Sequence, residues 1–291
     1  MSSTTPTARD LFLEAIGTIG NLYPAPRTLG RALTLLRDPD SDVGDIAALI
    51  AQDPALAADV LRCANSAAYG VGLHVSAIDE AVQKIGSSET IRIVGRVITQ
   101  SMTRHHLANY GIDAEDFWAE SLFNGIFVEQ LAEATGSLDR DEAYLCGLMR
   151  FIGRLAINQT IHAFGAGLFW DGHEPLSAWE QHNVGVSYAE AGGLLLRRWQ
   201  LPEAVSLAVE GQDLLESAES TVPLVQALHF TSTVLPPGLD LAFFLAVSDR
   251  PVAVPRQDPF VRAHGLSQDS IAELLATSQE KFSAIRDEHY H

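Results

Sequence analysis

The sequence lacks the features of an exported, membrane-bound or disulfide-bonded protein. Its first ten residues, MSSTTPTARD, contain no apolar stretch of the kind that a signal peptide needs. The longest unbroken run of aliphatic and aromatic residues, at 241–247, is far shorter than the roughly 20 residues of a membrane-spanning helix. The two cysteines, Cys63 and Cys146, have no metal-ligand spacing and are interpreted as buried free thiols. We therefore expect a cytoplasmic protein without membrane association.

Positive charge is also scarce. The chain has 19 lysines and arginines against 37 acidic residues, which gives a formal net charge of −18 at pH 7. Such a surface repels phosphate backbones. The densest basic groups, Arg92/Arg96/Arg104 and Arg197/Arg198, are diluted by apolar neighbours. The composition therefore argues against a nucleic-acid partner.

The sequence motifs of several large enzyme classes are missing. There is no G-x-x-x-x-G-K-[ST] loop, no G-x-S-x-G elbow and no dinucleotide-binding fingerprint. These absences argue against P-loop nucleotide hydrolases, α/β-hydrolases and dinucleotide-dependent oxidoreductases. With 47% hydrophobic and 19% charged residues, the chain still has the composition of a folded globular protein.

Strand patterns are nearly absent, and apolar residues recur at helical spacing along most of the chain. Turn and cap signals then place the helix starts. Helices are predicted over 43–50, 88–106, 115–134, 176–199 and 267–285, and a single buried helix is predicted to contain 144–156. Three further helices are predicted to start at Asp53-Pro54, at a capping box of Ser76 and Asp79, and at Pro202. The pattern predicts an all-α protein.

Several segments, taken in order, resemble the HDOD family. Leu36–Gly70 resembles the opening half of an HDOD domain, and the Ile-Gly turn at Ile85-Gly86 resembles the end of that half. The order continues with FWAES at 117–121, LCGLMRFIGRLAI at 145–157, YAEAGGLLLRRWQLP at 188–202 and GLSQDSIAELL at 265–275. The resemblance covers about residues 20–287 and implies two packed helical subdomains.

The helix pattern and the resemblance together divide the chain into three parts. Residues 1–19 are expected to form a partly flexible N-terminal segment, and 20–110 an N-terminal helical subdomain. Residues 111–287, with the C-terminal helix, are expected to form a degenerate bundle like that of the HD phosphohydrolases. The boundary is placed in the polar stretch around Gly111.

The resemblance also implies where metal ligands would lie, because HDOD domains are kin to metal-dependent phosphohydrolases of the His-Asp superfamily. The residues at the corresponding positions of this chain are Glu120, Arg150, Phe151, Tyr188, Gln212 and Asp213. None of them is a histidine, and the guanidinium of Arg150 would repel a metal cation. The expectation is therefore a protein without a metal, without another cofactor and without catalysis.

The other histidines and two of the glycines are interpreted as structural residues and not as metal ligands. His105-His106 are neighbours whose side chains diverge on a helix, and His162, His173 and His182 have no ligand spacing. Two glycines, at 147 and 153, are expected to allow close helix packing in the second bundle.

The absence of metal ligands at these positions leads to a specific prediction about Arg150. Arg150 is expected to act as the local cation and to form an ion pair with Glu120, or otherwise with Asp116 or Glu190. Phe151 is expected to turn into the apolar core. The alternative is a rotated helix that points Arg150 to solvent.

In function, the resemblance implies a stand-alone signalling module that acts by protein–protein interaction in bacterial signal transduction, in pathways linked to cyclic-di-GMP, motility or virulence. Its interaction surface is expected in the groove between the subdomains or on the exposed face of the N-terminal bundle. One alternative is a nucleotide-binding sensor whose degenerate cleft presents Arg150 and Arg154 to a phosphate. The other is a metal-dependent phosphohydrolase or phosphodiesterase with relocated ligands.

Overall fold

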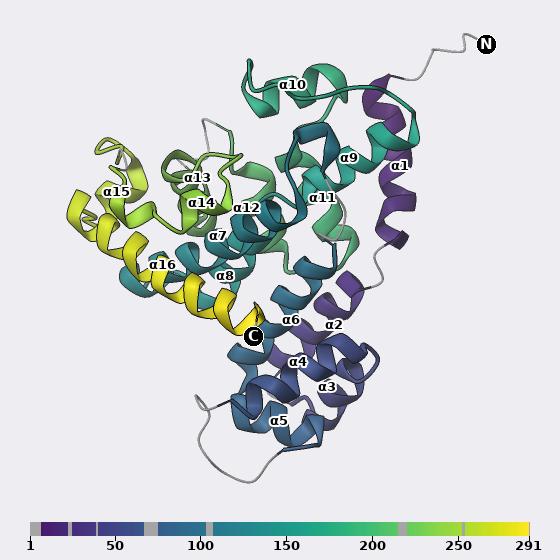
Figure 1. The fold of residues 1–291 in the computed structure, drawn as a ribbon, viewed down its shortest axis with the longest axis vertical. Coiled ribbons are helices and arrows are strands. Elements are labelled where there is room, and N and C mark those ends of the chain that lie inside the picture. Colours follow the sequence, from purple (N-terminus) through teal and green to yellow (C-terminus); the bar gives the residue numbers. More distant parts are fainter. Residues whose placement is uncertain are drawn as a thin grey trace.

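Figure 1 shows the computed structural model of the chain, which describes residues 7–22, 25–38, 40–66, 75–102, 107–214, 220–251 and 254–290. Within these ranges the secondary structure consists of helices, with a single isolated β-bridge between Leu107 and Ile112. The predicted all-α class is therefore confirmed. None of the described helices is both long and apolar enough to cross a bilayer.

The N-terminal bundle is built from short helices whose starts are fixed by local caps. It contains α2 (Ala25–Arg37), α3 (Val43–Ile50), α4 (Pro54–Ala64), α5 (Ile78–Ile85) and α6 (Ser87–Met102). Asp42 accepts a hydrogen bond from the Gly44 amide at the start of α3, and Asp53 accepts one from the Leu56 amide, as predicted for α4. The predicted capping box at Ser76 is wrong, because the extended residue before α5 is Ala77, which makes no side-chain cap.

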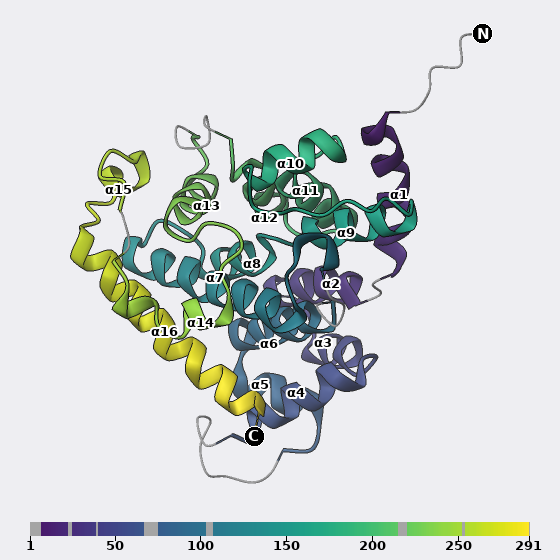
Figure 2. The same ribbon diagram turned by 45° about the horizontal axis from the view of Figure 1, so that its top comes forward.

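The second bundle surrounds two central helices. It contains α7 (Ala114–Thr135), α8 (Arg140–Met149), α9 (Gly153–Ala163), α10 (Leu176–Asn183), α11 (Tyr188–Arg198), α12 (Glu203–Gly211) and α13 (Pro223–Val234), with the short 3-10 helix η2 (Ala108–Tyr110) before α7. Every residue of α7 from Phe117 to Ala132 is buried. Figure 2 shows why: α7 and α8 lie between the N-terminal bundle and the helices α11 to α13.

Two helices that the periodicity joins are divided in the structure. The buried helix containing 144–156 is interrupted at 150–152, between α8 and α9, and the helix predicted for 176–199 is interrupted between α10 and α11. At the second break Gly185 adopts φ +79°, which a glycine tolerates without strain. The hydroxyl of Ser187 then caps α11 by accepting from the Glu190 amide at 3.2 Å.

The N-terminal helix packs on the second bundle rather than on the first. α1 (Ala8–Leu22) lies against α9 and α11, and its Phe12 is fully buried. Arg9 donates to the Gly185 carbonyl at 3.1 Å and forms an ion pair with Glu190. Residues 8–19, expected to be partly flexible, thus form part of a docked helix.

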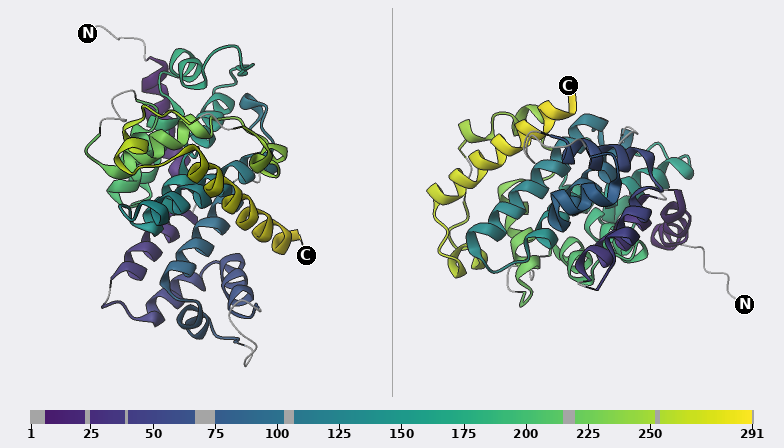
Figure 3. Two further views of the ribbon diagram at one scale, coloured as in Figure 1. Left: turned by 90° about the vertical axis from the view of Figure 1, so that its left-hand side faces the viewer. Right: turned by 90° about the horizontal axis from the view of Figure 1, so that it is seen from below.

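The C-terminal helix runs along the outside of the second bundle, as Figures 1 and 3 show. α16 (Gln268–Tyr290) follows three short elements, α14 (Leu241–Phe244), η4 (Val247–Asp249) and α15 (Pro259–Ala263). Its Phe282 is fully buried and lies within 6.3 Å, ring centre to ring centre, of Trp118, Phe123 and Phe244. This aromatic cluster attaches α16 to the buried helix α7.

Candidate functional site

The positions that correspond to the HD metal site converge where α7, the α8–α9 turn, α11 and the end of α12 meet. Five of the six are buried, and Asp213 is half-buried. The buried ones are Glu120, Arg150, Phe151, Tyr188 and Gln212. We call this set, with Arg154 and Asn124, the degenerate centre.

Arg150 fills the middle of the degenerate centre and has no solvent exposure. Its Nε donates to Gln212 Oε1 at 2.9 Å, and its Nη1 donates to Asn124 Oδ1 at 2.6 Å and to the Leu235 carbonyl at 2.7 Å. Gln212 returns a hydrogen bond from Nε2 to the Arg150 carbonyl at 2.9 Å. The guanidinium is therefore held by neutral oxygens, and the alternative in which Arg150 points to solvent is wrong.

The ion pair that we predicted for Arg150 is made by Arg154 instead. Arg154 Nη1 lies 2.7 Å from Glu120 Oε2, with both side chains buried. The two arginines lie on either side of the break between α8 and α9, and it is Arg154, in the first turn of α9, that meets the carboxylate. The other Glu120 oxygen accepts from the Gly238 amide at 2.7 Å.

The two other carboxylates proposed as partners of Arg150 are engaged elsewhere. Glu190 pairs with Arg9, and Asp116 accepts a hydrogen bond from the Leu241 amide at 2.9 Å. Within the described ranges, Arg150 has no carboxylate within 4 Å.

Phe151 is fully buried and lies between the two arginines, as expected for a core residue. The guanidinium carbons of Arg150 and Arg154 are 4.4 and 3.9 Å from the centre of its ring. Tyr188 packs beside it with 5.5 Å between ring centres. Contacts of cations with an aromatic face are stronger when the cation is desolvated, so this ring stabilises both buried charges.

The charge balance of the degenerate centre does not fit a metal ion. Of the two guanidinium groups only that of Arg154 pairs with a buried carboxylate, and Arg150 Nη2 and Arg154 Nε and Nη2 have no hydrogen-bond partner among the described residues. Burial lowers the pKa of Arg150, since it disfavours the charged form. Burial also raises the pKa of Tyr188, and the negative charge of Asp213 adds to that effect. A cation would meet donors and positive charge here, not ligands.

The remaining candidate ligands are dispersed. No group of three or more histidine, cysteine or acidic side chains in the described part of the chain could hold a metal. His162, His173 and His182 are exposed, and His105-His106 lie outside the described residues. Cys146 is a buried free thiol, as expected, whereas Cys63 is half-buried.

One buried acid near the centre was missed by the sequence analysis. Glu180, on α10, has no solvent exposure and accepts hydrogen bonds from the Tyr110 hydroxyl at 2.8 Å and from the Tyr188 amide at 2.5 Å. Burial raises the pKa of Glu180 to about 8, against the opposing effect of these hydrogen bonds. The carboxyl is therefore protonated at neutral pH in the folded protein.

A pH-dependent stability follows from Glu180. In the unfolded chain the carboxyl titrates near 4.5, so folding takes up a proton between about pH 4.5 and 8. The free energy of unfolding should fall as pH rises through this window, by up to about 1.4 kcal/mol per pH unit. Glu180→Gln removes the titration, and the Tyr110 hydroxyl can rotate to accept from the new amide. We expect the variant to gain stability relative to the wild type between pH 5 and pH 9, measured by urea unfolding.

The matched control is Glu174→Gln, because Glu174 is exposed. Its difference from the wild type should be the same at every pH. Parallel pH profiles for Glu180→Gln and the wild type would show that Glu180 is already ionised in the fold.

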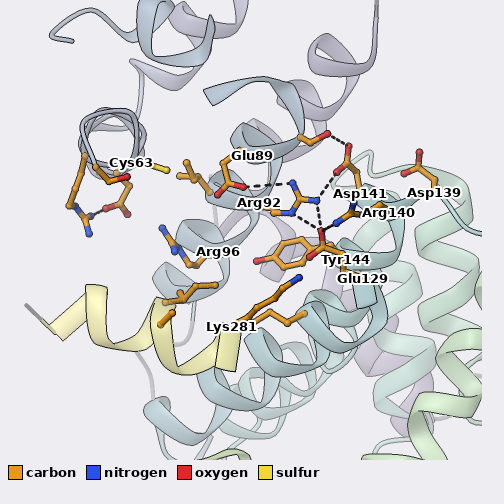
Figure 4. Close-up of a pocket in the computed structure, with 18 of the residues that line it drawn as sticks. Cys63, Glu89, Arg92, Arg96, Glu129, Asp139, Arg140, Asp141, Tyr144 and Lys281 are labelled. Atoms are coloured by element: carbon orange, nitrogen blue, oxygen red, sulfur yellow. Dashed lines mark hydrogen bonds and ion pairs between the residues drawn. The ribbon is translucent and has the colours of Figure 1, made fainter. Parts of the chain in front are cut away.

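A second site candidate is an open pocket between the two bundles, shown in Figure 4, with a volume of about 1070 Å³. Its walls come from α4 and α6 of the first bundle and from α7, α8, α16 and the loop before α8 of the second. We call it the inter-subdomain pocket. By contrast, Arg150 and Arg154 have no solvent exposure, so these two arginines are not presented to a nucleotide as we had supposed.

Comparison with known proteins agrees with this architecture. Residues 22–214 match the model of the HDOD domain. An uncharacterized protein from Treponema pallidum is 27% identical over 223 residues, which are 75% of this chain and 42% of that protein. The chain thus spans less than half the length of this curated relative.

Two solved structures share the fold. A proposed phosphohydrolase from Shewanella amazonensis is 25% identical with a TM-score of 0.62, covering 92% of this chain and 95% of its own. A proposed signal transduction protein from Marinobacter aquaeolei is 18% identical with a TM-score of 0.65, covering 96% of this chain and 64% of its own. Since the HDOD model matches more than half of the sequence, the chain belongs to the HDOD family, which is related to the HD phosphohydrolases.

Proposed function

We propose that the chain is a non-catalytic signalling module that acts by binding a protein partner in bacterial signal transduction. The observation that carries the proposal is the degenerate centre, where two buried guanidinium groups lie among residues that the resemblance assigns to a metal site. Guanidinium stays protonated and cannot ligate a cation. The helical scaffold is kept while its chemistry is replaced by packing, and selection then acts on the surface.

The family and one neighbour support this reading. The Marinobacter aquaeolei protein of the same fold is named as a proposed signal transduction protein. The link to cyclic-di-GMP, motility or virulence pathways that the resemblance suggested belongs to the same proposal. The rival function is a phosphohydrolase with relocated ligands, which the name of the Shewanella amazonensis protein favours.

Metal analysis and hydrolysis assays separate these two functions. We expect purified protein to retain less than about 0.1 equivalent of zinc, manganese, iron or magnesium after dialysis, because three ordinary ligands do not converge in the degenerate centre. We also expect no turnover of nucleotides or cyclic dinucleotides above that of the protein-free buffer. Turnover that copurifies with the protein, or a stoichiometric metal, would contradict the non-catalytic reading.

The partner surface is tested by two sets of charge reversals. Asp79→Lys with Glu80→Lys alters the exposed face of α5, and Arg62→Glu with Arg140→Glu alters the rim of the inter-subdomain pocket. We expect one set to reduce recovery of the same partner from the native cell by about tenfold or more. The thermal midpoint should change by no more than about 2 °C.

The control for both sets is Glu174→Lys, an exposed reversal on another side of the second bundle. If the partner is recovered equally with all three variants and with the wild type, the interface lies on neither of the two surfaces.

A further inference from the structure

The inter-subdomain pocket is rich in charged side chains and has as many basic as acidic ones. Ten of its nineteen lining residues are charged, five of them basic, in a protein whose net charge is −18. The lining consists of Asp59, Arg62, Cys63, Ser66, Ser88, Glu89, Arg92, Ile93, Arg96, Ile126, Glu129, Leu138, Asp139, Arg140, Asp141, Tyr144, Lys281, Ala284 and Ile285. A purely apolar partner or a nonpolar ligand would leave these charges without water or counter-charge.

Three of the five basic residues are already neutralised. Arg62 pairs with Asp59 on its own helix. Arg92 pairs with Glu129 and lies 3.6 Å from Asp141, and Arg140 lies 3.3 Å from Glu129. In Figure 4 the side chains of Arg92, Arg140, Glu129 and Asp141 form one ion-paired cluster on the side of the pocket formed by α7 and α8. Arg92 and Arg140 thus offset part of the acidic charge of Glu89, Glu129 and Asp141.

The other two basic residues differ. Arg96 on α6 and Lys281 on α16 form no ion pair with any described residue. Arg96 is half-buried and lines the pocket together with Tyr144. Its positive charge lowers the pKa of the Tyr144 hydroxyl, against the larger effect of burial, which raises that pKa. Figure 4 shows Arg96 apart from the ion-paired cluster and Lys281 entering from the C-terminal helix. Two uncompensated cations at a concave surface are what an anionic ligand requires.

The size and the rest of the lining narrow the ligand class. About 1070 Å³ is at the upper end of the range of small-molecule sites and far exceeds an inorganic phosphate. Ser66 offers a hydroxyl group, whereas the Ser88 hydroxyl donates to Asp141 at 3.0 Å. The half-buried Ile285 offers apolar surface against which a planar base can pack. A protein interface core would instead be depleted of charge.

We propose that the inter-subdomain pocket binds a nucleotide whose phosphate groups are held by Arg96 and Lys281. Because these residues belong to α6 of the first bundle and α16 of the second, the ligand bridges the two bundles and couples its own binding to their arrangement. This goes beyond the partner-binding function and does not require it. It also moves nucleotide binding away from the buried degenerate centre.

The experiment is calorimetric titration of the full chain with adenosine and guanosine mono-, di- and triphosphates and with cyclic dinucleotides. The unphosphorylated nucleosides and inorganic pyrophosphate serve as partial ligands. We expect at least one nucleotide to bind with a micromolar or lower Kd. Binding should weaken about tenfold or more in both Arg96→Gln and Lys281→Gln, since each loses a charge-assisted contact with phosphate. It should also weaken as salt rises.

The matched control is Arg286→Gln, which removes a basic residue of the same helix that pairs with Asp287 and does not line the pocket. It should leave the Kd unchanged, and all three variants should keep the wild-type thermal midpoint within about 2 °C. No binding by any nucleotide, or binding that both pocket variants leave unchanged, would overturn the proposal. If nucleotides fail to bind while Arg96→Gln and Lys281→Gln abolish partner recovery, the pocket is a protein interface and the nucleotide proposal is wrong.

Discussion

Replacement of Arg154 by methionine is expected to lower the free energy of unfolding by about 3 to 5 kcal/mol, because it leaves the Glu120 carboxylate buried without its counter-charge. The remaining partner of Glu120 is the Gly238 amide, which cannot balance a full charge at a side chain that is 1% exposed. Methionine keeps the length of the side chain, so the loss reflects charge rather than a cavity. Urea unfolding at pH 7, monitored by tryptophan fluorescence, measures the change.

The double variant Arg154→Met with Glu120→Gln identifies the cause of that loss. A neutral amide at 120 removes the stranded charge, so the double variant should regain at least half of the stability that Arg154→Met loses. Arg286→Met is the control, since its ion pair with Asp287 is at the surface and should contribute no more than about 1 kcal/mol. If Arg154→Met costs as little as the control, the buried pair is not what holds α7 to α9.

The degenerate centre is a packing core at positions where the resemblance implies a metal site. In an HD enzyme, a metal cation is placed among ligands from several helices. Here Arg150 binds three neutral oxygens contributed by α7, α12 and the end of α13, and so links the same helices through hydrogen bonds. Phe151, in the position of an aspartate, supplies an aromatic face to both guanidinium groups. The side chain of Arg150 therefore cross-links these helices.

Much of the fold could be predicted because helix starts depend on neighbouring residues. Asp53-Pro54 opens α4 as predicted, and the helix expected at 115–134 is α7 within one residue at each end. The breaks at 150–152 and 184–187 were missed, since apolar residues continue at helical spacing through both. A local signal existed only for the second, where Ser187 is followed three residues later by Glu190.

The residues of the degenerate centre could be predicted more readily than their pairing. The resemblance gave the positions from Glu120 to Gln212, and the structure brings them together. Whether Arg150 or Arg154 meets Glu120 depends on where α8 ends and how closely α7 approaches, which are tertiary properties. Glu180 gave no signal, because the Tyr110 hydroxyl that it binds lies 70 residues away in the sequence.

Replacement of Gly153 or Gly147 by alanine is expected to lower the free energy of unfolding by about 3 kcal/mol or more, because each glycine faces backbone that cannot move aside. A Cβ on Gly153 would lie 2.0 Å from the Tyr188 carbonyl oxygen, and one on Gly147 would lie 2.2 Å from that of Asn124. Overpacking against a side chain is relieved by a rotamer change, whereas here α9 must separate from α11, or α8 from α7. The thermal midpoint should fall by about 6 °C or more, measured by circular dichroism.

The matched control for these substitutions is Gly167→Ala, because a Cβ at Gly167 would have no heavy atom within 4 Å and its φ is not positive. The free energy of unfolding of Gly167→Ala should stay within about 1 kcal/mol of the wild-type value, and it should rise slightly if the substitution reduces the conformational freedom of the unfolded chain. The two clashes also differ in what they disturb. Gly147 sets the approach of Asn124 to Arg150, and Gly153 sets the approach of Tyr188 to Phe151. If Gly153→Ala and Gly147→Ala matched the control, the close helix contacts that assemble the degenerate centre would not exist in solution.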